Sequence, residues 1–168
     1  TYSNTLSFSF VVIGYSTTLP VLRNGSKLND DIYITNTVGD AFLGLYIIKK
    51  NKKILNHKYF VNSFYLPNIP YKFGKKMCLF ANAAIDISDG LFQDINHLME
   101  NSKFTYHLDL NKIPISVNLA KYLKKNNKKK KSFVSNGDDY QILFTAKKNK
   151  SNLIKRIAKK TNTLITKI

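Results

Sequence analysis

Hydrophobic and polar positions alternate in some stretches of the chain and follow helical spacing in others. Leu6–Val12 alternates and then becomes fully apolar, which predicts a strand with one well-buried face that stops at Gly14. Asp31–Thr35 predicts a second short strand. From Asp40 to Ile48 the residues are apolar almost all round, which predicts a buried helix.

The rest of the chain also combines segments of alternating polarity with segments of helical spacing. The pattern predicts helices over His57–Leu66, Lys75–Asn82, Leu91–Met99, Val117–Leu123 and Ser151–Lys160, and strands over Ala83–Ile87, Thr105–Leu110, Tyr140–Ala146 and Thr163–Ile168. Strands and helices are interspersed without strict alternation. The fold class that we expect is therefore α/β of the α+β type, with a mixed sheet and helices on its faces.

Size and composition limit the possibilities further. The chain has 168 residues, of which 43% are hydrophobic, enough for one buried core. No apolar run approaches the roughly 18 residues that a membrane span needs, so we expect no membrane partner. Cys78 is the only cysteine, which excludes an internal disulfide and is compatible with a reducing cytoplasm.

The formal net charge of +17 would attract phosphates or nucleic acid. Arg23 and Arg156 are the only arginines, however, and all other basic residues are lysines. Proteins that read nucleic acids favour Arg for its bidentate contacts. We therefore attribute the charge to a drift in the overall amino-acid composition. Nucleic-acid binding stays as the alternative.

Three acidic turns follow or precede predicted strands and hold five of the 10 carboxylates: Gly39-Asp40, Asp86–Gly90 and Gly137–Asp139. Asp86 ends a strand and Asp89 begins a helix. Carboxylates so placed can share Mg²⁺, and the helix N-terminus offers N–H groups to phosphates. The alternative is that Ser88 or Asp89 is only a helix N-cap.

The other candidate residues are also open to two interpretations. Asp40 either caps a helix or faces a ligand, with capping the better interpretation. Asp138 and Asp139 either bind a cation or form a solvated turn. Arg23 either clamps a phosphate or lies on the surface. The sequence contains no zinc-binding, dinucleotide-binding or P-loop motif.

Four ordered motifs give a more specific indication than any one residue. They are Arg23–Thr35, Val38–Ala41 with Gly44-Leu45, Ala84–Leu91 and Ser135–Tyr140. In this order they resemble the thiamine-monophosphate kinases. The wider superfamily includes the aminoimidazole-ribonucleotide and selenophosphate synthetases, so a sister activity of that kind is an alternative.

The resemblance implies a PurM-like fold and transfer of the γ-phosphoryl of ATP to thiamine monophosphate, which gives thiamine diphosphate. Matched to the family motifs, Asp86 and Asp89 are Mg²⁺ ligands, and Ser88 and Arg23 contact ATP. Asp138 stands where the family usually has a substrate-contacting Glu. No protein nucleophile is expected, because phosphoryl transfer depends on positioning and charge neutralisation.

The resemblance also implies a domain organisation. Residues 1–14 would be the last strand of an N-terminal ATP-binding domain, and residues 15–168 the C-terminal α/β domain. The family forms homodimers through the N-terminal domain. Since most family metal ligands lie in that domain, we expect the fragment alone to be inactive. Asn136 replaces the Gly usual in the family, a second departure beside Asp138.

Overall fold

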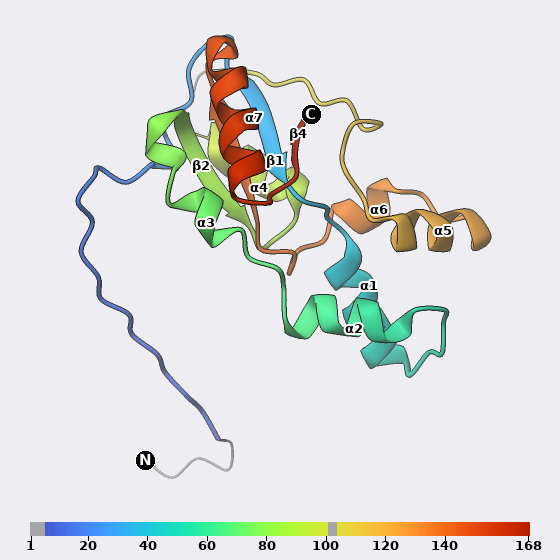
Figure 1. Cartoon of the computed structure of the whole chain (residues 1–168). Coiled ribbons are helices and arrows are strands. Elements are labelled where there is room, and N and C mark those ends of the chain that lie inside the picture. Colours follow the sequence, from blue (N-terminus) through green and yellow to red (C-terminus); the bar gives the residue numbers. More distant parts are fainter. Residues whose placement is uncertain (1–5, 101–103) are drawn as a thin grey trace.

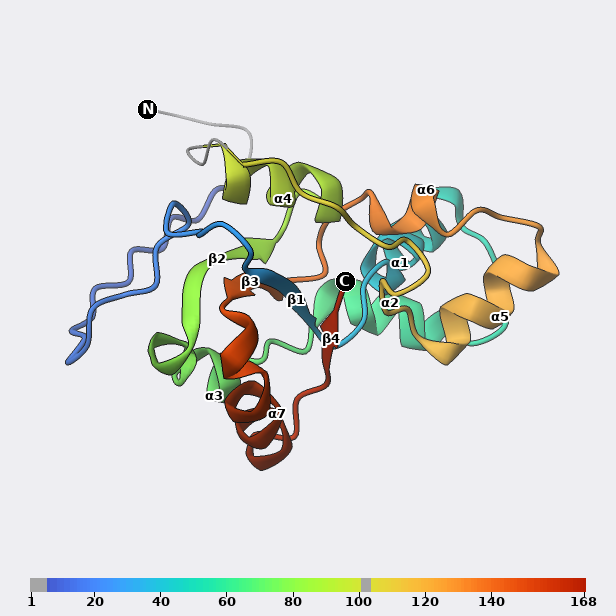
Figure 2. The same ribbon diagram turned by 90° about the horizontal axis from the view of Figure 1, so that it is seen from above.

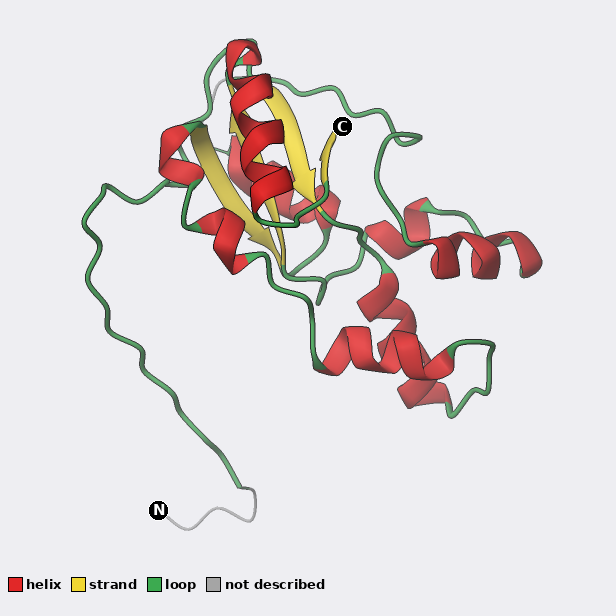
Figure 3. Cartoon of the chain, viewed as in Figure 1, coloured by secondary structure: helices red, strands yellow, loops and turns green. Residues whose placement is uncertain are grey.

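Four strands form one sheet in a computed structural model that describes residues 6–100 and 104–168. The strands are β1 (Asp31–Thr35), β2 (Ala81–Ile87), β3 (Gln141–Ala146) and β4 (Ile165–Lys167), in the order β2-β3-β1-β4 (Figures 1 and 3). The α/β fold class is confirmed. The sheet is antiparallel and not mixed, because all three ladders pair strands of opposite direction.

Helices cover both faces of this sheet. The helices of the described chain are α1 (Asp40–Lys50), α2 (His57–Tyr65), α3 (Tyr71–Gly74), α4 (Leu91–Met99), α5 (Val117–Lys125), α6 (Lys131–Val134) and α7 (Ser151–Lys160), with short 3-10 turns η1 (Met77–Leu79) and η2 (Lys148–Lys150). Figure 2 shows α4 on one face and α7 on the other, with α1, α2, α5 and α6 grouped beside the sheet.

The alternation within β1 explains the two layers. Ile32 and Ile34 belong to the core cluster that includes Ile95 of α4. Tyr33 points to the other cluster, where its ring stacks on Phe144 at 5.2 Å between centroids. Successive side chains of a strand face opposite sides, so a five-residue segment supplies both cores.

A third core holds the group of helices together. Leu43 of α1, Phe60 of α2 and Leu119 of α5 are almost fully buried in it. Gly44 lets α1 and α2 approach closely, because a Cβ there would overlap the backbone carbonyl of Phe60. The Gly44-Leu45 pair of the sequence motif therefore has a packing role.

The strand expected over Leu6–Val12 is not formed. Residues 6–16 pair with no strand in the described chain, and Phe8 and Val12 are 73% and 94% exposed. A strand needs a neighbour for its backbone groups, and none lies beside this segment. Residues 1–5 lie outside the described structure, and the division at residue 14 stays a prediction.

Two further predictions were wrong in part. Lys75–Asn82 is not one helix: it contains only the 3-10 turn η1, and β2 begins at Ala81. The segment expected as a strand over Thr105–Leu110 has no strand pairing among the described residues. Pairing partners, and not alternation alone, decide whether such a segment becomes a strand.

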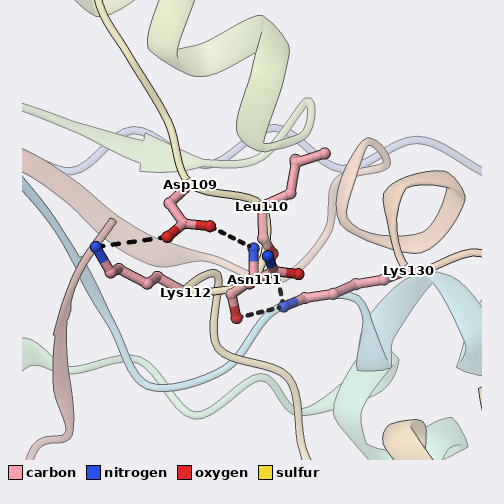
Figure 4. A network of polar contacts seen from close by, with 5 residues as sticks. All are labelled: Asp109, Leu110, Asn111, Lys112 and Lys130. Carbon is pink, nitrogen blue, oxygen red and sulfur yellow. Dashed lines mark hydrogen bonds and ion pairs between the residues drawn. The ribbon is translucent and has the colours of Figure 1, made fainter.

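The loop after that segment is held by a polar network instead (Figure 4). Lys130 Nζ donates to the carbonyl oxygens of Leu110, at 2.8 Å, and Asn111, at 3.2 Å. Asp109 accepts from the Asn111 N–H at 2.9 Å and pairs with Lys112 at 3.4 Å. The loop is thereby fastened to the residue that precedes α6.

None of the helices in the described part of the chain combines the length and hydrophobicity that crossing a bilayer requires.

Candidate active site

The end of β2 and the start of β3 bring two acidic turns together. Ile87 pairs with Gln141 in the antiparallel ladder. Beyond this pair, the Asp138 N–H donates to the Ser88 carbonyl at 3.0 Å and the Tyr140 N–H to the Ile87 carbonyl at 2.9 Å. The turn of residues 86–90 therefore lies against the turn of residues 137–139.

Glycines allow this close approach. A Cβ on Gly137 would overlap the carbonyl oxygen of Ser88, and one on Gly90 would overlap that of Ser135. Gly90 also has φ +131°, a conformation that L side chains rarely adopt. The glycines of both motifs are thus required by the contact between the turns.

The buried carboxylate of Asp139 adds the third acidic turn. Its Oδ2 accepts from the Gly39 N–H at 2.7 Å and its Oδ1 from the Ala41 N–H at 3.3 Å. These are the free donors at the start of α1. Asp139 is therefore the cap of α1, and its interpretation as part of a solvated turn was wrong.

Asp40, which we expected to cap α1, has another role. Its buried carboxylate accepts from Tyr59 Oη at 2.9 Å and from Ser116 Oγ at 2.7 Å. Ser116 also accepts from the Leu119 N–H and so caps α5. Asp40 thus joins α1, α2 and the start of α5.

Burial changes the ionisation of both carboxyls. It raises the pKa of Asp40, although the hydrogen bonds from Ser116 and Tyr59 oppose the shift. It raises the pKa of Asp139 to about 7, against the two backbone hydrogen bonds, and the neighbouring charges of Asp40 and Asp138 add to the rise.

Asp94 holds the remaining turn. Its Oδ2 accepts from the N–H groups of Asp89, at 3.2 Å, and Gly90, at 3.0 Å. Burial raises the pKa of Asp94 despite these bonds. The N-cap interpretation of Ser88 and Asp89 was wrong, because the N-cap of α4 is Gly90 and no backbone N–H of α4 donates to either side chain within the described residues. The N–H groups of Asp89 and Gly90 are thus already engaged.

The predicted metal and substrate residues lie at the surface of these joined turns. The side chains of Asp86 and Asp89 are exposed, and Ser88 and Asp138 are partly exposed. The Asp89 carboxylate accepts from Gln93 Nε2 at 3.1 Å. Asp138 has φ +67°, which Asp tolerates better than most residues. The structure therefore places all four residues in two turns that contact each other through their backbones.

Arg23 lies along the outer edge of β2, where the chain runs from Ala84 toward Asn82 and away from Asp86, since a Cβ on Gly25 would overlap the Asn82 carbonyl oxygen. The Ala84 N–H donates to the carbonyl of the preceding residue, Leu22, at 3.2 Å. Arg23 is exposed. Arg23 therefore lies beside the strand that carries Asp86, and not within the cluster of turns itself.

Sequence reasoning missed Gln141, which fixes the start of β3. Its Oε1 accepts from Thr35 Oγ1 at 3.0 Å and Asn36 Nδ2 at 2.9 Å. Its Nε2 donates to the carbonyls of Asn68, at 3.0 Å, and Asp139, at 3.1 Å. All these contacts but one span about 70 residues or more, so no local signal could have found them. The four-residue spacing from Gly90 to Asp94 was a signal for the missed hydrogen bonds between Asp94 and the turn before α4.

Solved structures of other proteins share the fold of this chain. The model matches the hydrogenase maturation protein HypE with a TM-score of 0.62 at 9% identity over 88% of the chain, which shows a shared fold alone. The chain therefore shares its α/β fold, a four-stranded antiparallel sheet with helices on its faces, with this class of solved proteins.

Within this class the chain is thiamine-monophosphate-kinase-like. The curated thiamine-monophosphate kinases of two Buchnera aphidicola subspecies, from Acyrthosiphon pisum and Schizaphis graminum, are 34% and 37% identical to it over 145 and 144 residues. The solved thiamine-monophosphate kinase of Stenotrophomonas maltophilia K279a matches with a TM-score of 0.79 at 27% identity. A solved complex of AaThiL with AMPPCP and TMP matches at 0.76 and 30%.

The matches cover most of this chain but not of its relatives. They span 84% and 83% of the chain against 45% and 44% of the Buchnera proteins. Against the two solved kinase structures they span 88% of the chain and 49% and 46% of the other chain. No protein-family model matches. The chain thus spans less than half the length of the relatives that it matches.

Proposed function

We propose that this chain is part of an enzyme that uses ATP and Mg²⁺ to phosphorylate thiamine monophosphate to thiamine diphosphate. The observation that carries the proposal is the contact between the turns 86–90 and 137–139, which gathers Asp86, Ser88, Asp89 and Asp138 at one surface. Relatives named as thiamine-monophosphate kinases, and the complex of one such protein with an ATP analogue and TMP, support it.

Asp86 and Asp89 would hold Mg²⁺. Their oxygen donors suit this hard cation, and no cationic side chain pairs with either in the described residues. No group of three potential metal ligands lies together in that part of the chain. Phosphate oxygens, water and groups outside this chain would complete the coordination. The metal would neutralise charge on the phosphates during transfer.

Arg23 and Ser88 would contact ATP. The exposed guanidinium of Arg23 can bind phosphate oxygens in a bidentate manner. Ser88 presents a partly exposed side chain, while its carbonyl is engaged by the Asp138 N–H. The hydrogen bond to the carbonyl fixes the backbone from which the Ser88 hydroxyl would donate to a phosphate oxygen.

Asp138 would contact thiamine monophosphate. Its side chain is one methylene shorter than the Glu usual in the family, so its reach is reduced. Its backbone is held by the hydrogen bond to Ser88 and the buried neighbour Asp139. We infer that the substrate must approach this turn more closely than in relatives with Glu.

The rest of the organisation follows the family. Residues 1–14 would belong to an N-terminal domain, 15–168 would form the C-terminal domain, and the parent enzyme would be a homodimer through the former. The exposed apolar side chains between Leu6 and Val12 suit a segment that packs against another domain. The exposed thiol of Cys78 suits a reducing cytoplasm.

The test uses the full-length parent protein with Mg-ATP and thiamine monophosphate, and chromatography of thiamine diphosphate. Asp86→Asn should remove at least 99% of turnover, since a lost metal ligand acts on the transition state. Glu100→Gln, an exposed carboxylate away from the turns, is the matched control and should keep full activity.

Absence of product from folded full-length protein would refute the thiamine reaction and favour a sister activity, to be assayed with selenide as acceptor. Turnover by residues 1–168 alone would refute the proposed inactivity of this part of the chain.

A further inference from the structure

A cavity lies at the end of the sheet opposite the acidic turns. Its volume is about 400 Å³, and loop 26–30, the start of β1, the end of β3 and segment 104–107 line it. From Gln141, beside the turns, to Ala146 β3 advances about 17 Å at about 3.3 Å per residue. The cavity is therefore separate from the proposed phosphoryl-transfer site, and nothing in the proposed function occupies it.

The inner wall of this cavity is polar. Thr145 is fully buried, and its Oγ1 makes only a long contact of 3.4 Å with Ser26 Oγ. A hydrogen bond of that length is weak, so the partly exposed hydroxyl of Ser26 retains capacity for a ligand oxygen.

The two carboxylates at the cavity are already engaged by the protein. Asp30 accepts from Asn82 Nδ2 at 2.9 and 2.8 Å and from the Lys27 N–H at 3.0 Å. Asp31 pairs with Lys167 Nζ at 3.5 Å. Their acceptor capacity is therefore directed into the fold, and the three lysines that line the cavity, Lys27, Lys148 and Lys167, outnumber these two negative charges.

Two ammonium groups at the same cavity are not engaged. Lys27 Nζ and Lys148 Nζ have no recorded ion pair or hydrogen bond within residues 6–100 and 104–168. Ammonium groups beside hydroxyl donors are suited to an anion, most strongly to phosphate oxygens.

Aromatic side chains also line this cavity. Phe104 and Tyr106 line the cavity and are 37% and 36% exposed. The Tyr106 hydroxyl donates to Asn96 Oδ1 at 2.6 Å, which fixes the ring. A flat ring can stack on such side chains while a charged group reaches the lysines.

We propose that this cavity binds a phosphate monoester that carries an aromatic ring, with the phosphate at Lys27 and Lys148 and the ring at Phe104 and Tyr106. The hydroxyl of Ser26 completes the phosphate contacts. Binding needs no metal, because the cations are supplied by the protein.

The test is an NMR titration of the isotope-labelled chain with adenosine 5′-monophosphate in the presence of EDTA, which suppresses metal-dependent binding at the acidic turns. Ribose 5-phosphate and inorganic phosphate are the comparison ligands. Lys27→Gln with Lys148→Gln removes the two cations, and Lys128→Gln, an exposed lysine of the loop before α6, is the control for general charge.

We expect saturable shifts at residues 26–31, 104–107 and 145–148, with at least tenfold weaker binding in the double variant and unchanged binding in Lys128→Gln. Adenosine 5′-monophosphate should bind more tightly than ribose 5-phosphate. No saturation at millimolar ligand, equal weakening by Lys128→Gln, equal affinity for the two esters, or shifts confined to the acidic turns would each overturn the proposal. A spectrum of the double variant that matches the wild type away from the cavity verifies its fold.

Discussion

The carboxylate of Asp139 accepts a 2.7 Å hydrogen bond from the backbone N–H of Gly39, a residue 100 positions earlier in the sequence. With the second bond to Ala41, it ties the turn before β3 to the start of α1. Because the same turn contacts Ser88, this relationship joins all three acidic turns at one end of the sheet.

Asp139→Ala should therefore destabilise the fold. It leaves the N–H groups of Gly39 and Ala41 buried without an acceptor, and each such group costs about 1–3 kcal/mol. We expect a loss of about 2–4 kcal/mol in the free energy of unfolding, measured by urea denaturation. Asp86→Ala removes an exposed carboxylate of the same region and should change stability by less than about 0.5 kcal/mol. Equal stability of the two variants would contradict the capping role.

The raised pKa of Asp139 predicts a pH dependence of stability. In the unfolded chain the carboxyl titrates near 3.8, and in the fold near 7. Between these values the folded state binds the extra proton, so this group's contribution is full below pH 3.8 and is lost as pH rises through 7. The slope is at most about 1.4 kcal/mol per pH unit.

Asp139→Asn cannot ionise, so the difference in stability between it and the wild type should shrink or change sign between pH 4 and 7. Urea denaturation of both at several pH values measures this difference and cancels the general effect of net charge. A constant difference across that range would show that the carboxyl keeps its ordinary pKa.

Gly137→Ala should separate the two joined turns. Its Cβ would overlap the Ser88 carbonyl oxygen, and backbone on both sides must shift. We expect a loss of about 2 kcal/mol or more in stability, comparable to other overpacking changes. Gly14→Ala is the matched control, because nothing lies within 4 Å of its Cβ position. Thermal unfolding followed by circular dichroism distinguishes them, and similar midpoints would argue against the close contact.

Asp94→Ala should loosen the turn that carries Asp89. The N–H groups of Asp89 and Gly90 lose their acceptor, so we expect their hydrogen exchange to accelerate at least tenfold, equivalent to about 1.4 kcal/mol of local stability. Gln93→Ala removes a neighbouring exposed side chain and should leave both amides protected. Unchanged protection in Asp94→Ala would mean that another group holds the turn.

The sequence by itself determined the elements whose pattern is local. The helical spacing from Leu91 to Met99 and from Ser151 to Lys160 gave α4 and α7 with the bounds observed, because a helix satisfies its own backbone and needs only one apolar stripe. The ordered motifs identified the kinase resemblance, and the match to that family proposed roles for Asp86, Ser88, Asp89 and Asp138, which stay predictions.

The tertiary structure alone decided which segments find partners. Leu6–Val12 and Thr105–Leu110 alternate as strands do, yet neither is paired in the described chain, because strand formation depends on a neighbour that alternation does not specify. The same holds for the caps. Whether Asp40 or Asp139 caps α1 depends on a contact across 100 residues, and only packing of β3 beside β2 and β1 brings the distant carboxylate to the helix start.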